Sequence, residues 1–374
     1  MSFTFIHTAD WQIGKPFAGF DAETAAALGG ARLAGIDRIA DAATKAGAKH
    51  VLVAGDVFDS ETASSRTVRQ LISTLAANAG QTWHLLPGNH DPVRAGSVWG
   101  EVVGAGPPPN VRLHLASVPV AIAPGVTLLP APLTQASTSI DPTAWMDLAV
   151  SPPGDLRIGL AHGSVQGNFG GDGDAAVPIA PDRPKLARLD YLALGDWHGT
   201  IRIADRVWYS GTHETDRFPD NAPGHVLVVQ LDGGAAKPAV QRVATSHFTW
   251  TKRTLRVSGL DDVIAFESDI ERLGRAQKTT LIDLALTGSV PLAEYAAIVT
   301  RLARIEQLCH LRINADALLA LAGGEDIAAL GEGAVRQAAE RLRVIADTGG
   351  VDAAVARRAL TRLAEFAIRD ARAR

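Results

Sequence analysis

The feature that most constrains the fold of this chain is a repeated unit in which an apolar strand runs directly into a polar loop. Helical spacing of apolar residues over 23–48 and 65–79 separates the first of these strands. The polar residues in the five loops are Asp10, Asp56, Asn89 to Asp91, His162 and the pair Asp196 and His198. Alternating strands and helices are typical of a layered α/β domain with a largely parallel sheet.

The character of the sequence changes near residue 250. Strand-like and helix-like stretches then alternate as β-α-β-α-β up to residue 318, and the rest is helical with glycine interruptions. A length of 374 residues fits two domains and a small further piece. We therefore expect boundaries that give the parts 1–250, 251–318 and 319–374.

Composition excludes several classes of protein. No stretch reaches about 18 uncharged apolar residues, so we expect no membrane-spanning helix. The start lacks the basic and apolar regions of a secretory signal, and the one cysteine, Cys309, excludes an internal disulfide, so we expect a cytoplasmic protein. With 36 Lys and Arg against 40 Asp and Glu, the net charge is −4, so nucleic-acid binding would need a local positive patch or metal ions.

The polar loops predict a metal site. The carboxyl ends of parallel strands meet at one edge of a sheet, so the loops should bring carboxylates, an amide and imidazoles together. This mixture suits manganese, iron or zinc, and an aspartate can bridge two ions. Each loop alone has an ordinary explanation, because an aspartate after a strand often caps a helix and Gly-Asn-His-Asp can form a simple turn. Their joint occurrence after successive strands favours the metal site.

Five motifs carry a resemblance to a known family. They are HTADWQIGKPF (7–17), GDVFDS (55–60), LPGNHD (86–91), LAHGS (160–164) and LGDWHG (194–199). Together they resemble the calcineurin-like metallophosphoesterase superfamily. The opening HTADW, the following Gly-Lys and the small C-terminal α/β unit are similar to the SbcD-type DNA repair exonucleases. The resemblance implies a four-layer α-β-β-α catalytic domain over 1–250, a small capping domain over 251–318 and terminal helices over 319–374.

Matched position by position, the resemblance implies two divalent ions. The first metal position would be formed by Asp10, Gln12, Asp56 and His198. The second metal position would be formed by Asp56, Asn89, His162 and Asp196. The same comparison makes His90 the acid that contacts the scissile phosphate and protonates the leaving oxygen, and Asp91 the group that orients it. His7 and Asp59 would support the site from behind the ligands.

Two positions depart from the family pattern. Gln12 and Asp196 stand where the family usually has a histidine. Gln12 should weaken the first position, whereas Asp196 adds charge at the second. Harder oxygen ligands favour Mn²⁺ over zinc, with Mg²⁺ and Fe²⁺ as alternatives.

The sequence leaves three functions open. The first is a manganese-dependent exonuclease that hydrolyses phosphodiesters at DNA ends in repair, with DNA duplex ends and an SbcC-like coiled-coil ATPase as partners. The second is a hydrolase of nucleotides or small phosphoesters, and the third is a DNA-end-binding subunit with a weakened metal site. A homodimer is also left open, and no membrane partner is expected.

Three further features have alternative interpretations. Trp11 and Trp197 either stack on a nucleobase or pack beneath the loops. The apolar stripe Ala356, Leu360, Leu363 and Ala367, beside arginines that include Arg369, either binds a partner or packs on its own domain. Surface placement is favoured for His213, and Lys15 either contacts a phosphate or is a solvated charge.

Overall fold

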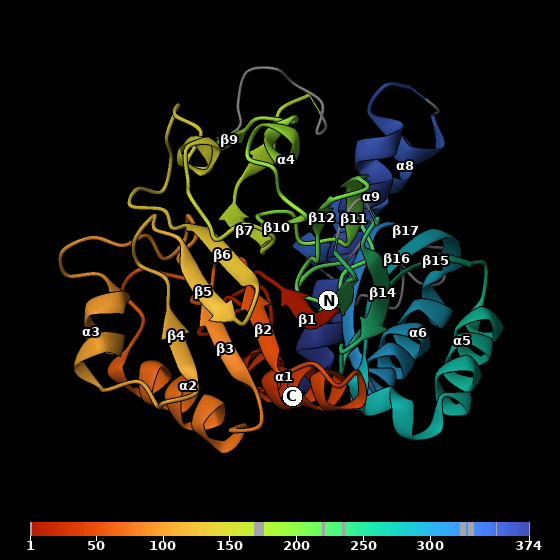
Figure 1. The fold of residues 1–374 in the computed structure, drawn as a ribbon. Helices are drawn as coiled ribbons and strands as arrows, with labels where there is room; N and C mark the ends of the chain where they lie inside the picture. Colours follow the sequence, from red (N-terminus) through yellow and green to blue (C-terminus); the bar gives the residue numbers. More distant parts are fainter. Residues whose placement is uncertain are drawn as a thin grey trace. The chain divides into compact units, whose positions relative to one another are not determined.

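The computed structural model describes residues 2–167, 176–218, 221–233, 236–321, 327, 333–348 and 350–373. The chain divides into two compact units, Met1–Phe248 and Thr249–Arg374, here called unit 1 and unit 2 (Figure 1). Both combine helices with sheets, so the predicted α/β class is confirmed.

Unit 1 contains two six-stranded sheets. The first has the order β14-β13-β1-β2-β3-β4, in which β1 to β4 are parallel and β13 is antiparallel to β1. Its strands are β1 Phe3–Thr8, β2 His50–Val53, β3 Thr82–Leu85, β4 Val111–Leu113, β13 His225–Leu231 and β14 Ala239–Ala244. Continuous apolar runs such as Val51 to Val53 form strands here because both faces of the sheet are covered.

The second sheet has the order β11-β12-β10-β7-β6-β5, and β12, β10, β7 and β6 are parallel. Its strands are β5 Val120–Ala123, β6 Val126–Ala131, β7 Leu156–His162, β10 Tyr191–Gly195, β11 Ile201–Ala204 and β12 Val207–Tyr209. A small pair, β8 Ser164–Val165 and β9 Pro178–Ile179, lies outside it.

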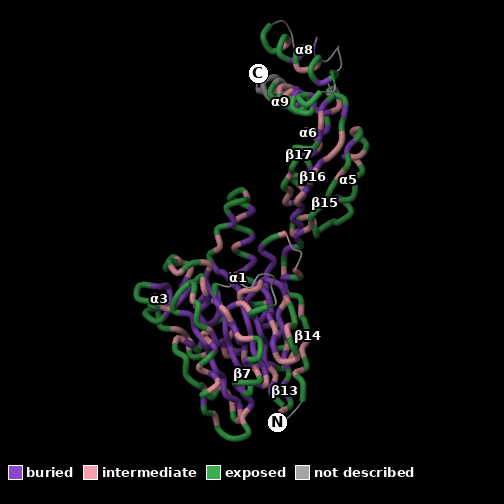
Figure 2. Tube along the Cα trace, turned by 90° about the horizontal axis from the view of Figure 1, so that it is seen from above, coloured by how far each residue is buried: buried purple, intermediate pink, exposed green. Residues whose placement is uncertain are grey.

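The two sheets pack face to face. Phe5 and Leu52 of the first sheet share one buried apolar cluster with Leu128 and Ile158 of the second. The outer face of the first sheet packs against α1 Ala22–Lys45, α2 Ser65–Ala77 and α3 Val98–Gly104. Among the described residues, the outer face of the second sheet packs against the short η1 Ala144–Asp147, α4 Arg183–Leu186, the β8–β9 pair and their loops. The layers are therefore α-β-β-α with a thin fourth layer, and the buried residues of unit 1 gather in the strands (Figure 2).

Unit 2 is a small α/β unit with three parallel strands in the order β15-β16-β17. Its elements are β15 Thr249–Val257, α5 Leu260–Arg272, η2 Gly274–Thr279, β16 Thr280–Pro291, α6 Leu292–Ile305, β17 His310–Leu321, α8 Ala334–Asp347 and α9 Ala353–Ala373. The boundary expected between residues 318 and 319 falls inside β17. The hydroxyl of Thr361 in α9 accepts a hydrogen bond from the backbone of Ala320 at 3.1 Å, which joins the terminal helices to the sheet.

The apolar stripe of α9 packs on its own unit. Ala356 and Leu360 are buried, and Leu363 is partly buried in a small cluster with Ile327 and Ala339. The side chains of Ala367 and Arg369 lie outside the described residues. These contacts favour the packing interpretation for the described part of the stripe.

In the described parts of the chain, none of the helices combines the length and the hydrophobicity that crossing a bilayer requires.

Candidate metal centre

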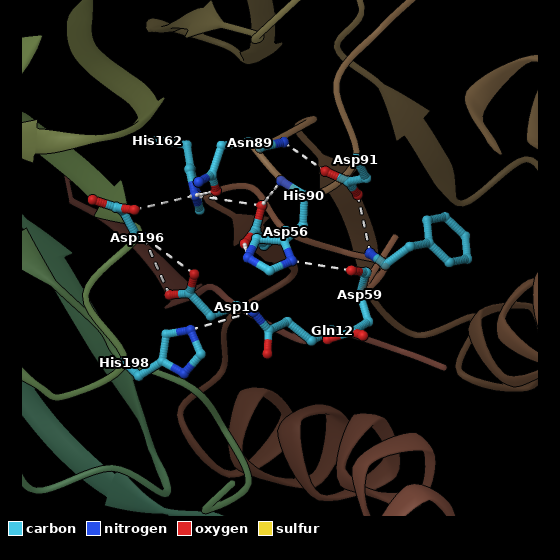
Figure 3. Close-up of polar contacts among 12 residues, drawn as sticks. Asp10, Gln12, Asp56, Asp59, Asn89, His90, Asp91, His162, Asp196 and His198 are labelled. Carbon is cyan, nitrogen blue, oxygen red and sulfur yellow. Dashed lines mark hydrogen bonds and ion pairs between the residues drawn. The ribbon is translucent and has the colours of Figure 1, made fainter. Parts of the chain in front are cut away.

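The predicted site residues meet at one edge shared by the two sheets of unit 1 (Figure 3). Asp10, Asp56 and Asn89 follow the parallel strands β1, β2 and β3 of the first sheet, and His162 and Asp196 end or follow β7 and β10 of the second. Backbone hydrogen bonds tie the first two loops together, from Asp10 N to Gly55 O at 3.1 Å and from Gln12 N to Asp56 O at 2.8 Å.

Backbone conformations that side chains rarely adopt cluster in these loops. Positive φ angles occur at Asp10 (53°), Gln12 (43°), Asp56 (53°) and Asp196 (104°). Such conformations cost about 1–3 kcal/mol each at residues other than glycine and are concentrated at functional sites. The surrounding hydrogen bonds hold the loops in place against that cost.

Two glycines allow the loops to approach so closely. A Cβ at Gly88 would lie 2.2 Å from Asp56 Oδ1, and a Cβ at Gly195 would lie 2.0 Å from the carbonyl oxygen of Ala54. Both distances are far inside van der Waals contact. Gly88 in the motif LPGNHD and Gly195 in the motif LGDWHG are therefore required by the packing of the loops.

Asp10, Asp56 and His162 form the centre of the site. Each is buried and offers one ligand atom, and these atoms lie within 4.8 Å of one another. His162 Nδ1 lies 2.9 Å from the carbonyl oxygen of Ala54, which can only accept a hydrogen bond, so Nδ1 carries a proton. His162 Nε2 therefore faces the pocket, 3.4 Å from Asp56 Oδ1 and 2.9 Å from Asn89 Oδ1.

The charged groups of the centre shift one another's pKa values. Burial opposes a charged imidazole at His162, but Asp56, Asp10 and Asp196 outweigh it and raise the pKa of His162 to about 9. Burial also raises the pKa of Asp10 to about 6. Asp196 N donates to both carboxylate oxygens of Asp10, at 3.1 and 3.3 Å, and Ser164 Oγ donates to Asp196 Oδ2 at 2.6 Å. The chemistry of this set, two buried carboxylates and an imidazole with further oxygens beside them, fits a divalent metal ion.

His90 lies at the open side of the centre, with Nε2 3.9 Å from Asp56 Oδ2 and its side chain 46% exposed. The expectation that Asp91 orients it requires correction. His90 Nδ1 lies 3.0 Å from the backbone carbonyl of Asp59, whereas the Asp91 carboxylate accepts from the backbone of Gly88 at 2.6 Å and of Phe58 at 3.0 Å. Burial, followed by the charge of Asp56, raises the pKa of Asp91 well above its usual range. Asp91 therefore shapes the loop, and the carbonyl of Asp59 orients His90.

The other expected ligands, Gln12 and His198, lie together. They are on the side of Asp56 away from His162 and Asn89 (Figure 3). Gln12 Nε2 is 3.3 Å from His198 Nε2, and Gln12 Oε1 accepts a hydrogen bond from Lys15 Nζ at 2.7 Å. His198 Nδ1 lies 2.9 Å from Asp216 Oδ2. Burial opposes ionisation of Asp216, but its hydrogen bond with His198 and the charges of His198, Arg32 and Lys15 hold the pKa of that carboxyl well below its usual range.

Arg32 is a supporting residue that sequence reasoning missed. This buried side chain of α1 donates to the backbone oxygens of Asp10 at 2.7 Å, Trp11 at 2.8 Å and Glu214 at 3.1 Å. It thereby fixes the first loop against the loop that follows β12. An arginine among the apolar residues of the buried helix face, four residues after Leu28, was the signal available in the sequence.

Two further histidines are buried. His7 is buried between the sheets, where Nε2 donates to the carbonyl of Leu194 at 3.1 Å and Nδ1 is 3.0 Å from the Tyr191 hydroxyl, so it joins β1 to β10 and does not line the pocket. His213 is fully buried, contrary to the surface placement expected, and its Nε2 lies 2.8 Å from the carbonyl of Arg32.

Trp11 packs beneath the loops. Its side chain is fully buried, donates to Thr8 Oγ1 at 3.0 Å and meets the ring of Trp83 edge to face. A buried indole cannot stack on a nucleobase, so the packing interpretation holds for Trp11.

Two facing α/β sheets with carboxylates and imidazoles at a common edge suit a metal-dependent phosphoesterase. Residues 3–165 match the sequence model of the family described as calcineurin-like phosphoesterase. The chain is also similar to the uncharacterized metallophosphoesterase YhaO of Bacillus subtilis (strain 168), with 23% identity over 312 residues that cover 77% of this chain and 72% of that protein. Both findings support the calcineurin-like metallophosphoesterase superfamily.

Proposed function

We propose that this protein is a metal-dependent nuclease that hydrolyses phosphodiesters at DNA ends, in the manner of the SbcD-type enzymes that its motifs resemble. Hydrolysis of phosphoesters in general is supported by the family match over residues 3–165. The observation that carries the proposal is the buried cluster of Asp10, Asp56 and His162, whose ligand atoms lie within 4.8 Å of one another.

Asp56, His162, Asn89 and Asp196 would hold a divalent ion, with Asp10 beside them. When bound, such an ion would supply the charge that lowers the pKa of a water molecule and offsets the charge of the phosphate. Four of these five residues offer oxygen ligands, which supports Mn²⁺, with Mg²⁺ and Fe²⁺ as alternatives.

His90 is the proposed general acid. The carbonyl of Asp59 holds the proton on Nδ1 and turns Nε2 toward Asp56, at 3.9 Å. The partly exposed imidazole can therefore reach a phosphate in the pocket and protonate the leaving oxygen.

DNA as the substrate has two lines of support besides the motif resemblance. Lys15 and Arg217 place positive charge beside the centre, with the Arg217 side chain 55% exposed. In unit 2, a cavity is lined by Arg312, Arg358 and Arg362, of which Arg312 and Arg362 also pair with aspartates. Cationic side chains of this kind bind phosphate oxygens without reading sequence.

The substrate is tested by comparing duplex DNA that has free ends, closed circular DNA and bis-p-nitrophenyl phosphate, each with Mn²⁺. We expect hydrolysis of the linear duplex, and little of the closed circle. The net charge of −4 favours the alternative of a small phosphoester, and hydrolysis of the aryl ester alone would establish it. The engagement of Gln12 by Lys15 favours the third candidate, a DNA-end-binding subunit, which would bind the linear duplex without cutting it.

We further propose an SbcC-like coiled-coil ATPase as partner. The sequence has no G-x-x-x-x-G-K-[ST] loop of its own, so ATP-driven activity would come from another chain. Val344 on α8 and Val355 and Phe366 on α9 are exposed at 60%, 64% and 68%, which supports a protein contact on these helices. Co-purification with such an ATPase, lost in a Val355→Asp, Phe366→Asp variant, would test the contact, and the elution volume of the isolated chain would test a homodimer.

A further inference from the structure

The first metal position differs from the second in how its side chains are already engaged. Lys15 Nζ lies 2.7 Å from the side-chain amide of Gln12. An ammonium group can only donate hydrogen bonds, so the atom of Gln12 that faces it must be the carbonyl oxygen. The oxygen that a metal would need is therefore turned to Lys15.

The same contact fixes the other end of the amide. With Oε1 on Lys15, the Gln12 NH₂ group points to His198 Nε2 at 3.3 Å. His198 Nδ1 lies 2.9 Å from Asp216 Oδ2 and 2.7 Å from Arg217 Nη2, so that nitrogen is engaged by the loop after β12 and Nε2 faces Gln12. The oxygen of Gln12 therefore faces a cation, and its NH₂ group faces the imidazole that was expected to bind the metal.

Lys15 is held where its charge acts on this position. Its ammonium donates to Asp216 Oδ2 at 3.1 Å and lies 3.9 Å from Asp59 Oδ1, and its side chain is only 23% exposed. Asp216 itself is 1% exposed at the side chain. The cation is therefore fixed by partly buried partners and is not a freely solvated surface charge.

At the second position, the contacts of the described residues join possible ligands to one another. The Nδ1 atom of His162 is satisfied by a backbone carbonyl, and its Nε2 faces Asp56 and Asn89 across the pocket. The atoms that meet at the second position are therefore possible ligands of a divalent ion, whereas at the first position the Gln12 oxygen is engaged by an ammonium.

We propose that the centre binds a single divalent ion, at the second position, and that the ammonium of Lys15 replaces the ion expected at the first. This inference rests on the proposed function, because it assumes that the centre is a metal site. The ammonium then supplies a fixed positive charge where a phosphate would otherwise meet a second ion.

The test is the number of Mn²⁺ ions bound by the full chain. After equilibrium dialysis, elemental analysis of the wild type is expected to find one Mn²⁺ per chain, with the electron paramagnetic resonance spectrum of an isolated ion. The double variant Gln12→His, Lys15→Met restores an imidazole and removes the ammonium, so it is expected to bind two ions that give an exchange-coupled spectrum. The matched control Lys45→Met removes an exposed ammonium at the end of α1 and should still bind one.

Two ions in the wild type would overturn this inference and leave the proposed function intact. No ion in the wild type would overturn the proposed function as well. A double variant that binds one ion, with an unchanged circular dichroism spectrum, would overturn the role of Lys15. The wild-type stoichiometry decides the matter even when the double variant does not fold.

Discussion

The two expected metal positions share Asp56, yet a backbone carbonyl orients the imidazole at the second, whereas an ammonium engages the amide at the first. At the second position, His162 is oriented by the carbonyl of Ala54 and presents Nε2 to the pocket. At the first position, the side-chain oxygen of Gln12 accepts a hydrogen bond from Lys15, and its NH₂ group faces His198. The hydrogen bonds behind motif residues thus decide which atom each side chain turns toward the pocket.

Removing the shared carboxylate should have the largest effect. Asp56→Asn takes away the group that both positions depend on, so we expect Mn²⁺ affinity to fall by more than about 100-fold, since even residues that only support ligands cost 10–100-fold. Isothermal titration with Mn²⁺ measures this. Asp269→Asn, on an exposed carboxylate of α5, is the control and should bind normally. Unchanged affinity in Asp56→Asn would place the metal elsewhere.

Removing His90 should separate chemistry from metal binding. Because His90 lies beside the ligands and is proposed to act as the acid, His90→Ala should lower kcat by about 10²–10⁴-fold while Mn²⁺ still binds. Steady-state hydrolysis and Mn²⁺ titration of the same preparation test both parts. The exposed His247 offers the control variant His247→Ala, which should be fully active. Full activity in His90→Ala would rule out the acid role.

Proton competition near neutral pH should come mainly from the second position. Without metal, the pKa of His162 is raised to about 9, so Mn²⁺ must displace a proton from it at neutral pH. We expect Mn²⁺ affinity to rise about tenfold per pH unit between about pH 6 and pH 8. The slope should become shallower in His162→Gln, which does not titrate there. An affinity that is independent of pH in the wild type would contradict this assignment.

Three histidines in a row away from the centre have lowered pKa values, whereas the pKa of His162 is raised. His50 Nδ1 lies 3.0 Å from His84 Nε2, and His84 Nδ1 lies 2.9 Å from His114 Nε2. Burial is the main cause that lowers all three pKa values, that of His114 to about 4, and Arg112 adds to the shifts of His84 and His114. No carboxylate is among the causes that shift these three imidazoles, in contrast to His162.

This row should produce the smallest effect, a loss of stability in acid. The unfolded imidazoles titrate near 6.5 and the folded ones lower, so stability is complete above about pH 6.5 and is lost as the pH falls through about 4. His114→Gln, compared with the exposed His247→Gln, should reduce the drop in Tm between pH 7 and pH 5 by a few degrees. Equal drops in both variants would exclude the row as a source of acid sensitivity.

Much of the fold could be predicted because its signals are local. The helices predicted over 23–48 and 65–79 correspond to α1 and α2, since apolar periodicity reflects which face of an element is buried. The short α3 was missed because seven residues are too few to show a helical period. The boundary expected at 318–319 falls inside β17, because a short apolar run such as Leu318 to Leu321 is compatible with either a helix or a strand.

The sequence by itself determined which donors this protein carries and that they follow successive strands. Strands that alternate with helices lie parallel, so their carboxyl ends and the donors that follow them meet at one edge of the sheet. Only the tertiary structure decided how those donors are used. It brings Lys15 to Asp216, 201 residues away along the chain, and it assigns His90 to the carbonyl of Asp59 instead of Asp91. Hydrogen-bond orientation depends on neighbours that are distant in sequence, and no pattern within a motif records them.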